Sequence, residues 1–258
     1  MTDKRDCLAP LADLGGVPEA VARARTAVDR MRAHPAMRRR GEIVSSESLR
    51  RGAAAAASLE TGGTTTATQR GAGRAYGQLG TLRQTWTHSP LQVLARLHLL
   101  AARGLVDDDR LGRPRVAGDL VREGPYDAML GAAPGPIEVH DRLDALVTVL
   151  AATRAPALVV AAVVHGEIAT LRPFVWGNQV VALAAQRLVL VELGLDPRSQ
   201  AVVEVGHLDA GEATSYGEAL AAYGTGRPDG VAVWVRHCGA AVQAGATDGI
   251  AICEALSR

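Results

Sequence analysis

Two apolar segments of helical length, only eight residues apart, constrain the fold of this chain more than any other feature. Residues 156–170 (PALVVAAVVHGEIAT) and 179–193 (QVVALAAQRLVLVEL) are apolar nearly all the way round, which is typical of helices enclosed by other helices. Each buries on the order of ten apolar side chains at ~1.5–3 kcal/mol per large one, so this pair is expected to form the centre of the fold. The eight residues between them are then held rigidly.

The remaining sequence also predicts helices, and the expected fold class is all-α. No segment shows the strict alternation over several residues that a sheet protein needs. Residues 105–136 collect Gly, Pro and Asp and predict a surface loop, with at most a small β-hairpin flap. Residues 71–80 are rich in glycine and predict a loop or a poor helix. Further helices are expected at 18–40 with a break at Pro35, 47–60, 90–103, 139–153, 209–223 and 231–243.

Length and composition suit one globular domain with an extension, since the chain has 258 residues and is 48% hydrophobic. We predict an N-terminal helical extension at 1–44, a helical domain at 45–225 and a C-terminal helix at 226–258 that packs on the same domain. The formal net charge of +1 lends no support to nucleic-acid binding.

Cysteine usage and apolar runs predict a cytoplasmic protein. Cys7, Cys238 and Cys253 are widely spaced, so neither a disulfide framework nor a metal site is expected, and a reducing cytosol fits best. The first ten residues lack the apolar stretch of a signal peptide, and the apolar run at 155–164 is about half of what spans a bilayer. We therefore predict no secretion and no membrane contact.

The segment between the two apolar helices, LRPFVWGN at 171–178, has the chemistry of an anion site. Asn178 is expected to cap the second helix and Gly194 to follow its end. A loop that enters a helix through Gly177 and Asn178 exposes backbone N–H groups at the positive end of the helix dipole. Such a helix start commonly holds phosphate.

This segment resembles the motif of the Fic (Fido) family, HPFx(D/E)GNGRxxR, which lies between two central helices. The sequence at 172–183 is RPFVWGNQVVAL, in which Pro173, Phe174, Gly177 and Asn178 match in place. His165 upstream and VELGLDP at 191–197 downstream also resemble the family, and the likeness covers about residues 45–225. The resemblance implies a Fic-like helical bundle and an activity that transfers AMP to a hydroxyl group.

The sequence departs from the family pattern at the residues that carry its chemistry. The resemblance places Arg172 where the family has the histidine base, and a guanidinium cannot accept a proton near pH 7. Trp176 replaces the acidic residue that holds Mg²⁺ and offers no oxygen ligand, while Gln179, Val180 and Leu183 replace the glycine and the arginines that clamp phosphate. An arginine can still bind phosphate, so the candidate anion- or nucleotide-binding residues are Arg172, Pro173, Phe174, Trp176, Gly177, Asn178 and Gln179.

A second feature resembles the inhibitory helix of the family, S/T-x-x-x-E-G/N. In AASLET at 56–61, Glu60 aligns with the inhibitory glutamate, although Ala56 replaces the Ser or Thr. The likeness implies a helix beside the former nucleotide site. We expect Glu60 either to pair with Arg172 across that site or to lie in solvent.

Three functions remain open from the sequence. The first is a catalytically inactive Fic-fold protein that binds a partner protein, a second copy of itself, or a nucleotide such as ATP without Mg²⁺. The second is a nucleotidyl- or phosphoryl-transferase that recruits another base, such as His165 or Glu167, although His165 is better interpreted as a hydrogen-bonded core histidine. The third is an unrelated helical module in which the Arg172 loop only packs. No metal site and no confident cofactor are predicted.

Overall fold

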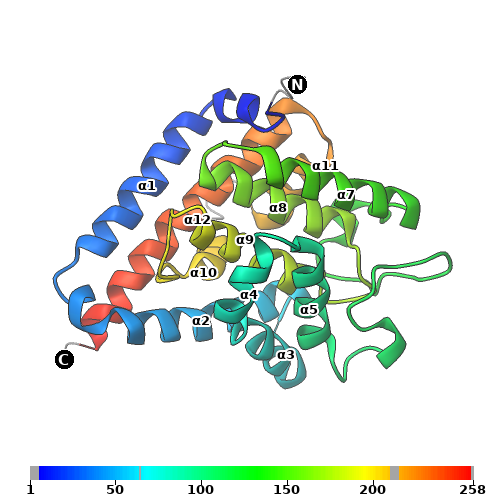
Figure 1. Cartoon of the computed structure of the whole chain (residues 1–258), viewed down its shortest axis with the longest axis horizontal. Helices are drawn as coiled ribbons and strands as arrows, with labels where there is room; N and C mark the ends of the chain where they lie inside the picture. The colour runs from blue at the N-terminus through cyan, green and yellow to red at the C-terminus, as the bar shows by residue number, and fades with distance from the viewer. Residues whose placement is uncertain (1–5, 64, 210–214, 257–258) are drawn as a thin grey trace.

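The computed structural model describes residues 6–63, 65–209 and 215–256, and within these residues it contains helices and no strand (Figure 1). The all-α prediction is confirmed. Two helices lie at the centre, α8 (Ala157–Leu171) and α9 (Asn178–Glu192). The others are α1 (Val17–Ala33), α2 (Met37–Thr61), α3 (Thr66–Tyr76), α4 (Leu79–Trp86), α5 (Pro90–Ala102), α6 (Asp127–Leu130), α7 (Pro136–Ala152), α10 (Val203–Asp209), α11 (Tyr216–Gly224) and α12 (Pro228–Ala255), with 3-10 turns η1 (Ala9–Asp13) and η2 (Asp108–Arg110).

The central pair is enclosed as its apolar sequence predicts. Every residue of α8 except Glu167 is buried, and α9 is buried from Asn178 to Leu190. The two helices pack against each other along their length, and α2, α5 and α12 cover them from different sides. The short loop between α8 and α9 is therefore anchored at both ends in the core.

Glycines allow several helices to approach more closely than larger residues would permit. A Cβ atom on Gly206 of α10 would lie 2.0 Å from the carbonyl oxygen of Ala241 in α12, and one on Gly71 of α3 would lie 2.1 Å from the carbonyl oxygen of Ala101 in α5. The glycine-rich 71–80 segment thus forms parts of α3 and α4, because tertiary packing outweighs its low helix propensity.

Several helices in the N- and C-terminal parts of the chain begin or end at residues other than the predicted ones. Pro35 separates α1 from α2 as predicted, but α2 then runs without a break from Met37, across the expected domain boundary at 44/45. The α1 helix packs along α12, which extends to Ala255 and so exceeds the predicted 231–243 (Figure 1). The helix predicted at 209–223 is represented by α11. Residues 1–5 and 210–214, on which predictions were also made, lie outside the described residues.

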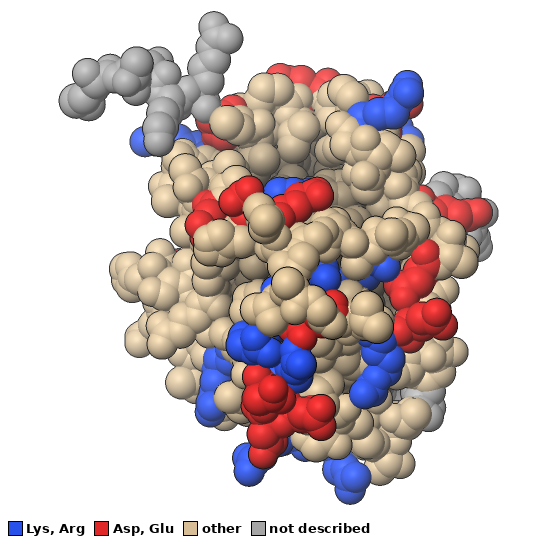
Figure 2. All heavy atoms as spheres, turned by 90° about the vertical axis from the view of Figure 1, so that its right-hand side faces the viewer, with Lys and Arg blue, Asp and Glu red and all other residues tan. Residues whose placement is uncertain are grey.

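The segment between α5 and α7 covers the outer side of the α8–α9 loop. The small β-hairpin predicted here is wrong for these residues, which contain η2, α6 and one isolated bridge between Arg103 and Val106. The reason is that backbone donors of this segment pair with the central loop instead: the N–H groups of Arg115 and Arg122 donate to the carbonyl oxygens of Pro173 (2.7 Å) and Val175 (2.8 Å). Figure 2 views the molecule from this side, where basic and acidic side chains are interleaved.

Among the described residues, no helix is a candidate for a membrane-spanning segment. None of these helices combines the length and the hydropathy that crossing a bilayer requires.

Candidate functional site

Two residues with left-handed backbone conformation and the side chain of an asparagine hold the α8–α9 loop in one conformation. Arg172 ends α8 with φ +47° and Gly177 precedes α9 with φ +83°. Asn178 does not cap α9 as predicted; its side chain accepts a hydrogen bond from the N–H of Phe174 (2.9 Å) and donates one to the carbonyl oxygen of the same residue (2.8 Å). Gly194 does follow the end of α9, with φ +75°. The asparagine therefore closes the loop and leaves the helix start uncapped by its own side chain.

Phe174 anchors the loop in the core. Its ring stacks on the imidazole of His98, with ring centroids 4.0 Å apart and planes within 4° of parallel. The Nδ1 atom of His98 accepts a hydrogen bond from the N–H of Gly112 (2.9 Å), and burial lowers the pKa of His98 to about 4. His98 is therefore neutral near pH 7 and acts as a packing partner of the loop.

Glu60 occupies the anion site at the start of α9. One of its carboxylate oxygens accepts a hydrogen bond from the N–H of Gly177 (2.8 Å), and the other accepts from the N–H groups of Gln179 (2.7 Å) and Val180 (3.3 Å). These are unpaired donors at the positive end of the helix dipole, where a phosphate would otherwise be favoured. Glu60 reaches them from the last turn of α2 and is 9% exposed.

The Glu60 carboxylate titrates near neutrality. Burial raises its pKa to about 7, because a charge is costly to remove from water. The three backbone donors oppose this shift by stabilising the ionised form, while the negative charge of Asp127 adds to it. The carboxylate therefore changes charge near pH 7 in the site that it fills.

Glu60 neither pairs with Arg172 nor lies in solvent, so both alternatives expected for it are wrong. The Nη1 of Arg172 donates to the carboxylate of Asp127 (2.9 Å) in α6, and its Nη2 donates to the carbonyl oxygen of Gly131 (2.8 Å). The left-handed backbone of Arg172 sends the guanidinium toward α6, whereas the N–H groups of α9 hold Glu60. Asp127 is thus a member of the site that sequence analysis missed, since a single acidic residue in a loop-rich segment carries no signal.

Trp176 is buried and does not fit a metal site. Trp176 is 6% exposed. The guanidinium carbon of Arg122 lies 6.0 Å from the centroid of the Trp176 ring. An indole supplies no oxygen to Mg²⁺. Within the described ranges, no group of three or more His, Cys, Asp or Glu residues is arranged to hold a metal ion.

The side chain of Gln179 is engaged in the core. Its Oε1 accepts a hydrogen bond from the hydroxyl of Tyr216 (2.5 Å), whose oxygen also lies 2.8 Å from Nε2 of His165. The Nδ1 atom of His165 lies 3.0 Å from Oε1 of Gln186, and burial lowers the pKa of His165 to about 3. The prediction of a hydrogen-bonded core histidine at 165 is confirmed.

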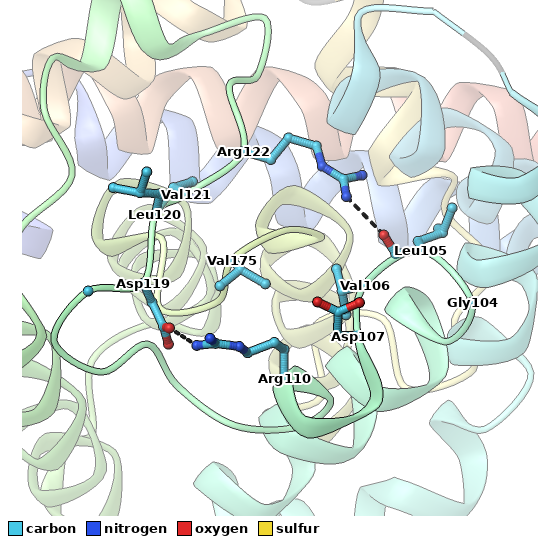
Figure 3. Close-up of a pocket in the computed structure, with 11 residues that line it drawn as sticks. Gly104, Leu105, Val106, Asp107, Arg110, Asp119, Leu120, Val121, Arg122 and Val175 are labelled. Carbon is cyan, nitrogen blue, oxygen red and sulfur yellow. Dashed lines mark hydrogen bonds and ion pairs between the residues drawn. The ribbon is translucent and has the colours of Figure 1, made fainter.

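Two cavities flank the loop, and of the candidate anion-binding residues only Pro173 and Phe174 line one of them. One of about 680 Å³ lies under the 104–122 segment, where Val175 alone represents the loop (Figure 3). In it, Arg122 donates to the carbonyl oxygen of Leu105 (2.9 Å) and Arg110 pairs with Asp119. The other, of about 710 Å³, includes Pro173 and Phe174 in its lining. Arg172, Trp176, Gly177, Asn178 and Gln179 line neither cavity.

Comparison with known proteins identifies the fold. No family model matches the sequence, and no curated protein sequence matches it. A solved structure does match: Fic-1 (residues 134–508) from C. elegans has a TM-score of 0.58 and 15% identity, over 93% of this chain and 73% of that chain. This chain has a Fic-like fold. The resemblance in the sequence therefore correctly predicted the Fic-like bundle, and an identity of 15% supports the fold alone.

Within this Fic-like fold, residues of the sequence motif lie together in and beside the α8–α9 loop. The loop brings together Arg172, Phe174, Trp176, Gly177 and Gln179, and α2 adds Glu60. Four residues at the loop that the sequence did not predict are His98 in α5, Arg115 between η2 and α6, Asp127 in α6 and Tyr216 in α11. None of these four lies in a motif, and only packing brings them to the loop.

Proposed function

We propose that this Fic-fold protein does not transfer nucleotidyl groups and acts by binding. The observation that carries the proposal is the position of the Glu60 carboxylate, which accepts hydrogen bonds from three N–H groups at the start of α9. These are the donors that an incoming phosphate would need. A nucleotide must therefore displace Glu60 before it can bind here.

The residues at the motif positions support the absence of transfer. Catalysis of hydroxyl attack needs a group that accepts a proton, and Arg172 is a cation already paired with Asp127. The family position for the Mg²⁺ ligand holds the buried indole of Trp176. These residues therefore do not fit a magnesium ion.

The two alternative bases are both committed to other partners. His165 contacts Gln186 and Tyr216 in the core, and its lowered pKa of about 3 reflects full burial. Glu167 accepts hydrogen bonds from Arg142 (2.8 Å) and from the hydroxyl of Tyr223 (2.7 Å). The N–H groups at the start of α9 donate to Glu60 and to neither of these two groups, so no specific observation favours the transferase with altered chemistry.

While Glu60 occupies the start of α9, the protein would bind a partner protein, and that partner could be a second copy of this chain. A nucleotide such as ATP, without Mg²⁺, is assigned to the state in which Glu60 has left the α9 start. Because both states share one fold, a ligand that binds only the second must supply the free energy of displacing Glu60.

Labelled ATP tests the catalytic part of the proposal. The protein is incubated with α-labelled ATP and Mg²⁺ or Mn²⁺, alone and with cell lysate, beside an active Fic enzyme as the positive control. We expect no label on any protein above the level without the chain. Label transferred in proportion to the amount of this chain would contradict the proposal.

Glu60→Ala tests the binding part. Removal of the carboxylate frees three N–H donors, so equilibrium binding of ATP, ADP and AMP without Mg²⁺ is expected to tighten by about tenfold, the equivalent of ~1.4 kcal/mol. Glu47→Ala, on the same helix and away from the α9 start, is the matched control and is expected to leave the affinity unchanged. Equal nucleotide affinity in the wild type and in Glu60→Ala would refute the gating role of Glu60.

A further inference from the structure

The cavity of about 710 Å³ beside the motif loop has an apolar wall built from four parts of the chain. It lies between α5, the first turns of α7, the 113–117 stretch and the motif loop. Its size falls within the range of ~300–1,000 Å³ that holds small organic ligands. The apolar residues that line it are Leu91, Leu94, Ala95, Pro114, Val116, Ala117, Pro136, Ile137, Val139, Leu143, Pro173 and Phe174.

The charges in this wall are of one sign. Arg113 and Arg115 line the cavity together with His140, and no Asp or Glu is among the lining residues. Two of these groups have an acidic neighbour outside the wall: Nη2 of Arg113 lies 3.8 Å from Asp119, and Nε2 of His140 lies 3.5 Å from Asp144. Arg115 differs from both.

Arg115 is a buried cation that meets carbonyl oxygens and no carboxylate among the described residues. It is 6% exposed. Its Nε donates to the carbonyl oxygen of Arg172 (2.7 Å), and its Nη2 donates to those of Pro134 (2.8 Å) and Leu171 (3.3 Å). This arrangement caps the C-terminal end of α8, but it leaves Nη1 without a hydrogen bond to any described residue.

The electrostatic surroundings of Arg115 favour a negative charge beside it. Burial is the main cause of its lowered pKa, and the neighbouring charge of Arg172 lowers that pKa further. The carboxylate of Asp127 pairs with Arg172, and no ion pair with a described residue is formed by Arg115. A buried charge without a counter-ion is costly, so an anion at the free edge of Arg115 would be strongly favoured.

We propose that this cavity binds a small apolar carboxylate, with its hydrocarbon part against the apolar wall and its carboxylate at Arg115 and Arg113. A carboxylate matches the planar edge of a guanidinium. A phosphate would bring more polar oxygens than this largely apolar wall can satisfy. The ligand would contact Pro173 and Phe174, whereas Glu60 binds the N–H groups of Gly177, Gln179 and Val180, which do not line this cavity, so the inference is independent of the function proposed above.

Three probes of equal chain length and different head group test the charge requirement. Octanoate, octanol and octylamine are titrated into the full chain by calorimetry at pH 7.5. Octanoate is expected to bind at least about tenfold more tightly than octanol, since one ion pair with a guanidinium adds that much in a partly buried site. Octylamine is expected not to bind. Methyl NMR signals of Leu94 and Val116 are expected to shift with octanoate.

A matched pair of surface variants tests the location. Val116→Glu places a negative charge in the cavity wall at a residue that is 45% exposed, and it is expected to weaken octanoate binding by about tenfold or more. Leu120→Glu makes the same change on the same segment, at a residue that is 86% exposed and outside this wall, and it is expected to stay within about twofold of the wild type. The fold is expected to tolerate both substitutions because the side chains at these two positions reach solvent.

Several results would overturn the inference. They are equal affinity for octanoate and octanol, binding of octylamine, and octanoate binding that Val116→Glu does not weaken. A molecular mass in solution that shows a dimer, converted to a monomer by Val116→Glu alone, would assign the cavity to contact with a second copy. Absence of binding by all three probes would also reject the proposed ligand class.

Discussion

The N–H of Gln179 donates a 2.7 Å hydrogen bond to the carboxylate of Glu60, across a separation of 119 residues in the sequence. The bond joins the last turn of α2 to the first turn of α9. It places a negative side chain at the positive end of a buried helix dipole, an arrangement that stabilises the carboxylate. The same contact removes the donors that make the start of α9 attractive to phosphate.

The stability of the protein is expected to depend on pH through Glu60. Its pKa is raised from 4.5 in the unfolded chain to about 7 in the folded protein, so the folded state binds more protons between these values. The stabilisation from protonation is fully present below pH 4.5 and is lost as pH rises through 7, amounting to about 3 kcal/mol. Urea unfolding at pH 5 and pH 8, for the wild type and for Glu60→Gln, measures it.

The difference between these two proteins isolates Glu60. The lowered pKa values of His98 and His165 destabilise the folded state as pH falls below 6.5, but they do so equally in both proteins. The free energy of unfolding of the wild type relative to Glu60→Gln should therefore fall between pH 5 and pH 8. A difference that stays constant over this range would show that Glu60 has an ordinary pKa.

The pair formed by Arg172 and Asp127 is expected to stabilise the motif loop. Their side chains are 6% and 26% exposed, so the pair is partly desolvated and a double-mutant cycle with Arg172→Gln and Asp127→Asn should give a coupling of about 1–3 kcal/mol. The same cycle on Arg227 and Asp229, each 74% exposed, should give no measurable coupling. Similar couplings in the two cycles would argue that the loop pair is effectively solvated.

Gly177 is expected to be intolerant of substitution because of its backbone. Its φ of +83° disfavours any L side chain, although a Cβ atom would meet only His98, at 3.7 Å. Gly177→Ala should cost about 1–2 kcal/mol in thermal or urea unfolding. Gly73→Ala, inside α3 with open space around it, should instead stabilise by about 0.5–1 kcal/mol. A neutral Gly177→Ala would mean that the loop relaxes to a negative φ.

A buried ion pair ties α9 to α10. Glu204 is 1% exposed and accepts hydrogen bonds from Arg187 and from the hydroxyl of Tyr76 (3.0 Å). Glu204→Gln leaves a buried guanidinium without its counter-charge and should cost about 3–5 kcal/mol. Glu192→Gln, in the more exposed pair with Arg83, should cost at most about 1 kcal/mol. Equal losses of unfolding free energy would contradict this contrast.

The sequence by itself determined the central pair of helices and the rigid loop between them. Side chains that are apolar on every face, as in 156–170 and 179–193, can satisfy burial only inside a bundle, so their position in the fold needs no further information. The motif also placed Phe174 and Gly177 in the loop and Asn178 at the start of the second helix. The sequence did not predict the short helix α10, and the predicted last helix at 231–243 is shorter than α12, which extends from Pro228 to Ala255.

Tertiary structure alone decided which groups face one another at the site. Both Glu60 and Arg172 were assigned to the former nucleotide site, yet the backbone N–H groups of α9 hold the carboxylate, and Asp127 holds the guanidinium. Hydrogen bonds require donor–acceptor distances correct to a few tenths of an ångström and suitable angles. A linear sequence contains neither. Where α2 ends relative to α9 follows from packing of the whole bundle, which is why only the folded chain could show that the anion site is already filled.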